Sequence, residues 1–245
     1  MEGCVLGMRM MVVFEKGLAL RHIGHLDLMR SMQRALRRSG LPIVYSKGFN
    51  PHIELSFASP LGVGVAGLRE MMDLPIAEDI AEEEFVRLLN TAVPPSLPVK
   101  RARLIPDNFP SLMSLTAASR YTLRFSGKEA GEVIAKKLAK KLPEWLALSE
   151  YTALRKTKSG EKLCDIRPFV QEAEAVFVGD DLEIRCILEA TPLGTLKSSL
   201  FAKCLRDFAG IENAEDAPCA AIRQELLCRA HTGELVRMED YQDVW

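Results

Sequence analysis

The residues best suited to chemistry are concentrated in residues 20–62, which hold three of the four histidines: His22, His25 and His52. An imidazole can donate or accept a proton near neutral pH, so His25 or His52 could act as a general acid or base, with Asp27 nearby. His22 and His25 are three residues apart and His52 could join them, so a metal site is conceivable. No established catalytic or metal-binding motif surrounds these residues, however, and we predict no metal and no cofactor.

The same stretch carries four arginines: Arg30, Arg34, Arg37 and Arg38. On a helix this spacing gathers them on one face. Planar guanidinium groups bind phosphate in a bidentate manner, so the stripe predicts an anion-binding surface. A charged helix face that contacts only water is the alternative.

A Gly/Asn/Pro turn follows the arginines, with Lys47 and Asn50 within it. Tyr45 and Phe49 flank Lys47, and exposed aromatic rings can stack on nucleic-acid bases. The alternative is that both rings belong to the core. A second basic run supplies further candidate binding residues: Arg155, Lys156, Lys158 and Arg167.

The pattern of apolar residues and turn signals predicts the elements that position these groups. Over about the first 105 residues it gives the order strand, helix, strand, strand, helix, strand, which is the order of a ferredoxin-like unit. The first helix runs from about His25 to Arg38 and is ended by Ser39 and Gly40. The other predicted elements are strands at 9–19, 52–58, 70–75 and 97–106 and a helix at 80–90.

The second half repeats this plan, with predicted strands at 120–125, 144–158, 161–178, 182–190 and 222–232 and helices at 128–142 and 193–210. We therefore predict an α+β protein made of two tandem ferredoxin-like (βαββαβ) units with antiparallel sheets. The predicted boundaries are 1–105 for the first unit, 106–118 for a linker and 119–245 for the second unit.

The composition is that of a folded globular protein, with 48% hydrophobic and 27% charged residues. No apolar run is long enough to span a bilayer, and the N-terminus has no signal-peptide pattern, so we expect a cytoplasmic protein without a membrane partner. The six cysteines are scattered and form no CxxC pair. The net charge is −1, yet residues 1–60 carry eight Lys/Arg against four Asp/Glu. Residues 61–96 carry two against seven, a separation that charges at helix ends commonly produce, so it does not by itself indicate a partner.

The segments HLDLMRSMQRALRRSGLPIVYSKGFNPH and IELSFASPLGVG resemble the N-terminal signature of the bacterial radical-SAM-linked proteins, the DUF2344 family. The later segment LRKTKSGEKLCDIRPFV resembles a second landmark of that family. The chain departs from the family pattern at Gly24, where serine is usual, at Ile53, where a proline is usual, and at 62–65. The matching positions are His25, Asp27, Arg34, Arg37, Arg38, Tyr45, Ser46, Gly48, Phe49, Asn50, Pro51, His52, Asp165, Arg167 and Pro168.

The resemblance implies an association with a radical SAM protein, either as a separate chain or fused to it. The chain has no CxxxCxxC motif to ligate an iron–sulfur cluster, so the radical chemistry would belong to the partner. Three hypotheses follow. The favoured one is an RNA-binding accessory protein, related to tRNA or rRNA. The others are a protein subunit that presents a substrate to a radical SAM enzyme and a metal-independent ribonuclease or transferase.

Overall fold

The computed structural model describes residues 8–126, 131–157, 160–191, 194–211 and 219–241. By its internal contacts the chain divides into two compact units. The first unit comprises Met1–Thr116 together with Glu225–Trp245, and the second comprises Ala117–Gln224. The described residues form five α-helices and mostly antiparallel strands, which confirms the predicted α+β class. The finer prediction of two tandem ferredoxin-like units stays a prediction.

The first unit is built around β1, which pairs antiparallel with β3 on one side and with β4 on the other. The short strand β2 pairs with β3. The elements of this unit are β1 (Met8–Lys16), η1 (Leu18–Leu20), α1 (His25–Arg38), β2 (Ser56–Phe57), β3 (Val65–Ile76), α2 (Glu82–Ala92), β4 (Val99–Pro106), α3 (Leu112–Leu115), β12 (Leu235–Arg237) and η3 (Met238–Asp240). The strand β11 (Cys219–Arg229) continues from the second unit into the first.

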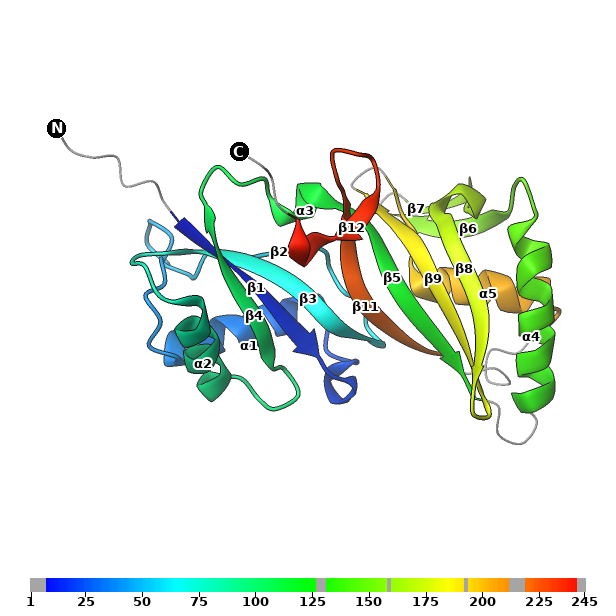
Figure 1. Cartoon of the computed structure of the whole chain (residues 1–245), viewed down its shortest axis with the longest axis horizontal. Coiled ribbons are helices and arrows are strands. Elements are labelled where there is room, and N and C mark those ends of the chain that lie inside the picture. Colours follow the sequence, from blue (N-terminus) through cyan, green and yellow to red (C-terminus); the bar gives the residue numbers. More distant parts are fainter. Residues whose placement is uncertain (1–7, 127–130, 158–159, 192–193, 212–218, 242–245) are drawn as a thin grey trace. The chain divides into compact units, whose positions relative to one another are not determined.

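Strand β1 is buried on both faces. Met10, Val12 and Phe14 pack in one cluster with the apolar sides of α1 and α2, which lie together beside the strands (Figure 1). Met11 and Val13 point to the opposite face. That face is covered by the segment after β4 and by the returning C-terminal residues, which supply Phe109, Leu112, Leu226, Cys228, Met238 and Tyr241. The unbroken apolar run MMVVF is therefore typical of a strand with no solvent-facing side.

Replacing Met238 by alanine tests the role of the C-terminal segment in this unit. The Met238 side chain is 1% exposed, so Met238→Ala should lower the free energy of unfolding by about 2–5 kcal/mol. Chemical denaturation of the full chain measures this change. Met113→Ala is the matched control, because Met113 is half exposed and its loss should cost about 0.5 kcal/mol or less. Equal effects of the two substitutions would contradict the assignment of 225–245 to the first unit.

Helix α1 has the boundaries predicted from the sequence, His25 to Arg38. It begins after an extended Gly24. Asp27 lies in its first turn and Arg37 and Arg38 in its last, so these charges interact favourably with the helix dipole. At its end, the Ser39 hydroxyl donates to the carbonyl of Leu36 (2.7 Å), and Gly40 adopts φ 73°. The buried Lys16 ammonium donates to the carbonyls of Arg21 and Ile23, which fixes the turn that leads into the helix.

The second unit is arranged around β9, which pairs antiparallel with β5 and with β8. Strands β6 and β7 form a separate two-stranded sheet. The elements are β5 (Thr116–Phe125), α4 (Gly131–Leu146), β6 (Thr152–Thr157), β7 (Gly160–Asp165), η2 (Arg167–Phe169), β8 (Val170–Val178), β9 (Asp181–Thr191), β10 (Gly194–Thr195) and α5 (Ser198–Phe208). The fully buried Trp145 packs against Phe201 and Tyr151 and so joins α4 to α5 and to the start of the hairpin.

Several predicted elements differ from the observed ones. The strand predicted at 144–158 begins only at Thr152, because α4 continues through Pro143 and buries Trp145. The strand predicted at 161–178 is interrupted by η2. The predicted linker 106–118 contains α3 and the start of β5. The residues 225–245, predicted within the second unit, belong by their contacts to the first.

No helix among the described residues has both the length and the apolar character needed to cross a membrane. The predicted cytoplasmic location stays a prediction.

Candidate functional site

A closed loop after α1 presents an exposed aromatic ring. An isolated bridge between Tyr45 and Ile53 brings its two ends together. The Ser46 amide donates to the carbonyl of His52 (2.8 Å), and the Ser46 hydroxyl accepts from the His52 amide (3.0 Å) and contacts His52 Nδ1 (2.8 Å). Gly48 at φ 130° allows the chain to turn at the tip. Beside it, the Phe49 side chain is fully exposed.

The other predicted binding residues of this loop are also at the surface: Lys47 and Asn50 are exposed, and Tyr45 is 40% exposed. The alternative that Phe49 belongs to the core is therefore wrong, because no part of its ring is covered. The loop is closed by Ser46 and His52, whose pairing gives the tip a defined place at the surface.

The arginines of α1 divide into two groups. All four are exposed, but among the described residues Arg30, Arg34 and Arg37 make no hydrogen bond or ion pair outside α1. Arg30 forms only a 3.3 Å ion pair with the equally exposed Asp27, and Arg34 donates to the Ser31 hydroxyl (3.1 Å). Exposed pairs of this kind contribute little stability, so these side chains can exchange their partners for a ligand.

Arg38 belongs to the second group. Its Nη2 donates to the carbonyl of Ala92 at the end of α2 (2.7 Å). This bond satisfies a carbonyl that the helix itself leaves without a partner and ties α1 to α2. To contact a ligand as predicted, the Arg38 guanidinium would have to give up its hydrogen bond to Ala92.

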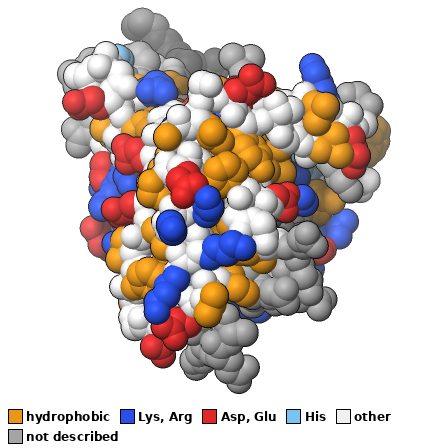
Figure 2. Space-filling view, turned by 90° about the vertical axis from the view of Figure 1, so that its right-hand side faces the viewer, with side chains coloured by type: hydrophobic (Ala, Val, Ile, Leu, Met, Phe, Trp, Pro, Cys, Tyr) orange, Lys and Arg blue, Asp and Glu red, His pale blue; other side chains and the backbone are white. Residues whose placement is uncertain are grey.

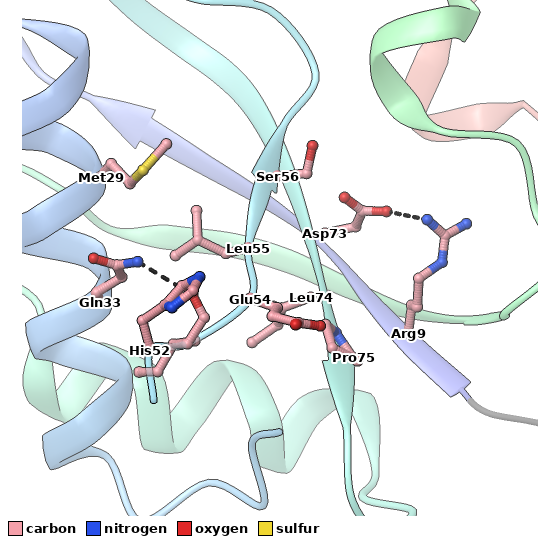
Figure 3. A pocket seen from close by; sticks show the side chains of 11 residues that line it. Arg9, Met29, Gln33, His52, Glu54, Leu55, Ser56, Asp73, Leu74 and Pro75 are labelled. Atoms are coloured by element: carbon pink, nitrogen blue, oxygen red, sulfur yellow. Dashed lines mark hydrogen bonds and ion pairs between the residues drawn. The ribbon is translucent and has the colours of Figure 1, made fainter. Parts of the chain in front are cut away.

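A cleft of about 390 Å³ lies between α1, the segment 52–56 and residues 73–75 of β3. Figure 3 shows Met29 and Gln33 reaching from α1 on one side, with His52 and Leu55 across from them. Gln33 Nε2 donates to the carbonyl of Ile53 (3.1 Å), which holds the loop segment against the helix. The complete lining is Arg9, Met29, Gln33, His52, Ile53, Glu54, Leu55, Ser56, Asp73, Leu74 and Pro75.

Helical spacing connects the cleft with the exposed arginines. Gln33 lines the cleft, and Arg37 and Arg30 lie one turn after and one turn before it on the same side of α1. Arg34 follows Gln33 directly and continues the basic surface away from the cleft. We call the exposed arginines Arg30, Arg34 and Arg37, the loop 45–53 and the cleft together the α1 surface.

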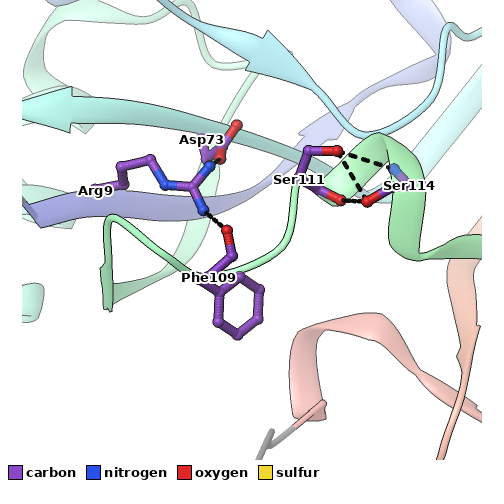
Figure 4. Close-up of polar contacts among 5 residues, drawn as sticks. All are labelled: Arg9, Asp73, Phe109, Ser111 and Ser114. Carbon is purple, nitrogen blue, oxygen red and sulfur yellow. Dashed lines mark hydrogen bonds and ion pairs between the residues drawn. The ribbon is translucent and has the colours of Figure 1, made fainter.

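An ion pair between Arg9 and Asp73 forms one end of the cleft (2.6 Å). The Asp73 side chain is 4% exposed, and its burial raises the pKa of its carboxyl group, while the Arg9 charge opposes that rise. Arg9 also donates to the carbonyl of Phe109, so the pair fixes the segment after β4 to β3 (Figure 4). A few residues further on, the Ser111 hydroxyl accepts from the Ser114 amide (3.2 Å) and begins α3. Sequence reasoning missed both charged residues as part of this site.

The histidines do not gather in one place. His25 packs its ring against Phe57 (5.3 Å between centroids) and does not line the cleft. Its partial burial lowers the pKa of the imidazole, which favours the neutral form. His22 accepts a hydrogen bond from its neighbour Arg21 (3.0 Å). His52 alone reaches the cleft, and its Nδ1 is occupied by Ser46.

The general acid/base candidates of the ribonuclease hypothesis, His25 and His52, therefore lie in different surroundings, and that hypothesis stays a prediction. Asp27 is exposed at the start of α1 and pairs with Arg30. Within the described ranges, no three His, Cys, Asp or Glu side chains lie close enough together to hold a metal ion.

A protein-family comparison matches residues 9–198 to a family described as "Uncharacterized protein conserved in bacteria (DUF2344)". The chain belongs to the DUF2344 family. The matched range includes both segments that carried the sequence resemblance. No curated protein matches this DUF2344 chain.

A search of solved structures finds the crystal structure of a candidate glycine cleavage system transcriptional repressor. It has 10% sequence identity to the DUF2344 chain, and the similarity covers 87% of this chain and 96% of the other. The TM-score is 0.21, and a likeness at that level carries no argument about fold or function.

The second landmark of the DUF2344 chain, DIRP, has a structural role. Asp165 accepts hydrogen bonds from the amides of Tyr151 (2.9 Å) and Arg167 (3.0 Å). The Arg167 guanidinium donates to the carbonyls of Leu146 and Val170. These bonds join the end of α4, the start of β6 and η2. The predicted RNA contact of Arg167 has no support, because its guanidinium is occupied by the backbone.

The rest of the predicted basic run lies on the hairpin β6–β7. Arg155 is partly buried, with its guanidinium over the ring of Phe169 (5.9 Å). Lys156 lies within β6 opposite Glu161, and Lys158 lies outside the described residues. Figure 2 shows one face of the molecule, on which cationic, anionic and hydrophobic side chains are interspersed.

Proposed function

We propose that the chain is an RNA-binding accessory protein that contacts single-stranded RNA through the α1 surface. The observation that carries the proposal is the fully exposed Phe49 ring, held at the tip of a closed loop whose base is hydrogen-bonded to Gln33 on the arginine-bearing helix α1. An aromatic side chain in water leaves a large apolar surface uncovered, which suits a residue that stacks on a partner. Stacking on aromatic rings and contacts of arginine with phosphate are two of the interactions that single strands offer.

The cleft supports the same proposal. It combines apolar residues such as Met29 and Leu55 with the hydrogen-bonding groups of Gln33, His52 and Glu54. An unstacked base has two apolar faces and a polar edge, and a cleft with both kinds of lining is complementary to it. The basic helix face borders the cleft, so a strand whose phosphates follow α1 could place a base there.

We also propose that each unit has the ferredoxin-like fold, which recurs in RNA-recognition modules. In the first unit the strands lie side by side in the order β4-β1-β3-β2. Along the chain, α1 follows β1 and α2 follows β3, which is the order of a βαββαβ unit. In the second unit the order β11-β5-β9-β8 matches it as well, with the hairpin β6–β7 inserted. The link from this fold to RNA is an analogy with other modules of the same fold.

Fluorescence anisotropy with a labelled single-stranded RNA tests the proposal. The full chain at low salt should bind the RNA, and the affinity should fall steeply as salt is added, because bound phosphates release counterions. No binding at low salt, or binding that does not change with salt, would contradict it.

A separate radical SAM protein is the second candidate partner, and exposed apolar side chains favour a protein interface. Leu18, Leu26 and Val63 are all more than half exposed. The turn 62–64 lies close to the segment before α1, because the Gly64 amide donates to the carbonyl of Arg21 (2.8 Å). If this hypothesis holds, the two recombinant chains should co-purify. Their separation at micromolar concentration would count against it.

A further inference from the structure

The second unit contains a larger cleft, of about 750 Å³, between the hairpin β6–β7 and α5. The Tyr151 hydroxyl donates to the carbonyl of Cys204 (3.2 Å) and so joins the two walls at their base. A volume of this size is in the range of small-molecule sites. The cleft is lined by Tyr151, Thr152, Ala153, Leu154, Arg155, Glu161, Thr195, Lys197, Ser199, Leu200, Lys203, Cys204, Arg206 and Asp207.

Cations outnumber anions in this cleft. Four of the lining side chains are Lys or Arg and two are acids. On α5 the acid Asp207 is paired with Lys203 (2.5 Å). Arg155 approaches from the hairpin and Lys197 from the position just before α5. This excess of positive charge favours an anionic ligand.

The polar groups near Lys197 suit a phosphate group in particular. Ser199, two residues after Lys197, adds a hydroxyl group to the lining, whereas the Thr195 hydroxyl donates to the carbonyl of Thr191 (3.2 Å). Arg155 can offer two parallel N–H donors, and its guanidinium is oriented by the ring of Phe169. A dianionic phosphate would balance the excess of two positive charges among the lining residues.

The cleft also has an apolar part. Leu154 and Leu200 line it, and Leu154 is 51% exposed. Its cross-strand partner Leu163 is not among the lining residues, so the apolar surface of the cleft itself is that of Leu154 and Leu200. A ligand that carries only a phosphate would leave this surface in water, whereas one with an additional apolar or aromatic portion would cover it.

The groups in the cleft indicate binding rather than covalent chemistry. Burial raises the pKa of the Cys204 thiol to about 11, so the thiol stays protonated and unreactive near neutral pH. Burial also raises the pKa of Tyr151, whose hydroxyl is already committed to a backbone carbonyl.

We propose that this cleft binds a nucleoside monophosphate, with the base against Leu154 and Leu200 and the phosphate against Arg155 and Lys197. The site is independent of the α1 surface, because every residue that lines it belongs to the second unit. It also gives the basic run on β6 a role that does not require an RNA strand.

Isothermal titration calorimetry of the full chain with AMP and with UMP tests this site. At least one of the two should bind with a Kd below about 1 mM, and adenosine and inorganic phosphate should each bind at least tenfold more weakly, because each supplies half of the contacts. The double variant Arg155→Gln, Lys197→Gln should weaken nucleotide binding at least tenfold with an unchanged melting temperature. Lys136→Gln, Lys140→Gln on α4 is the matched control and should bind as the natural protein does.

Failure of this proposal is distinguishable from failure of RNA binding. A chain with Arg30, Arg34 and Arg37 replaced by glutamine should keep its nucleotide affinity. Absence of binding at millimolar AMP and UMP would overturn the proposal, and so would equal affinity of the natural protein and the Arg155/Lys197 double variant.

Discussion

Replacing Arg30, Arg34 and Arg37 together by glutamine is expected to weaken binding of single-stranded RNA about 100-fold at about 0.1 M salt. Each contact between a cation and a phosphate of a single strand contributes about 0.7 to the slope of log affinity against log salt concentration. At about 0.1 M salt, one such contact therefore raises the affinity about fivefold. Loss of three contacts should therefore also reduce the slope by about 2. Fluorescence anisotropy over a range of salt concentrations measures both quantities.

The triple variant should remain folded, because these three side chains are exposed and their contacts are confined to α1 or absent among the described residues. A variant with Lys136, Lys140 and Lys141 replaced by glutamine removes the same charge from the second unit. It should bind RNA nearly as the natural protein does. Equal losses in the two variants would mean that net charge, rather than the α1 surface, determines the affinity.

Phe49→Ala is expected to weaken RNA binding by about 1–3 kcal/mol, the usual contribution of one base stacked on an aromatic ring. This corresponds to a loss of about 5- to 150-fold in affinity. The stability of the protein should not change, because the ring makes no buried contact in the absence of a ligand. The salt dependence should also stay the same, since no charge is removed.

Phe177→Ala is the matched control for the stacking prediction. Phe177 lies on β8 in the second unit and is 48% exposed, so its loss removes a surface phenyl ring without touching the α1 surface. It should leave RNA affinity unchanged. If Phe49→Ala also binds RNA with the natural affinity, the ring does not stack on a base.

Local sequence signals were enough to predict both ends of α1. Its apolar residues recur at helical spacing, and Ser39 and Gly40 supply the stop that the structure uses. The exposed loop was also predictable as a turn, because Gly48 permits a positive φ and Pro51 fixes its own φ there. The sequence left the choice between a buried and an exposed Phe49 open, since that depends on what packs over the loop.

Contacts between distant residues could not be predicted. The second buried face of β1 depends on Met238 and Tyr241, more than 200 positions later in the chain. Arg38 and Arg167 resemble surface cations in sequence, yet each donates to a backbone carbonyl, of Ala92 and of Leu146. Such pairings arise from tertiary packing and leave no local pattern.

The cleft of the first unit was missed for the same reason. It combines α1 with β1, β3 and the segment 52–56, and its ion-paired residues, the partly buried Arg9 and the buried Asp73, are 64 positions apart. One signal was available. Gln33 is an uncharged residue among the arginines of α1. Its side chain holds the segment 52–56 against the helix through the carbonyl of Ile53.

Ultraviolet crosslinking of the full chain to single-stranded RNA, followed by mass spectrometry of the crosslinked peptides, tests the central claim most directly. We predict crosslinks within residues 45–53, with Phe49 the principal one, and in α1. Crosslinks confined to the second unit, or none at an RNA concentration that saturates binding, would contradict the account.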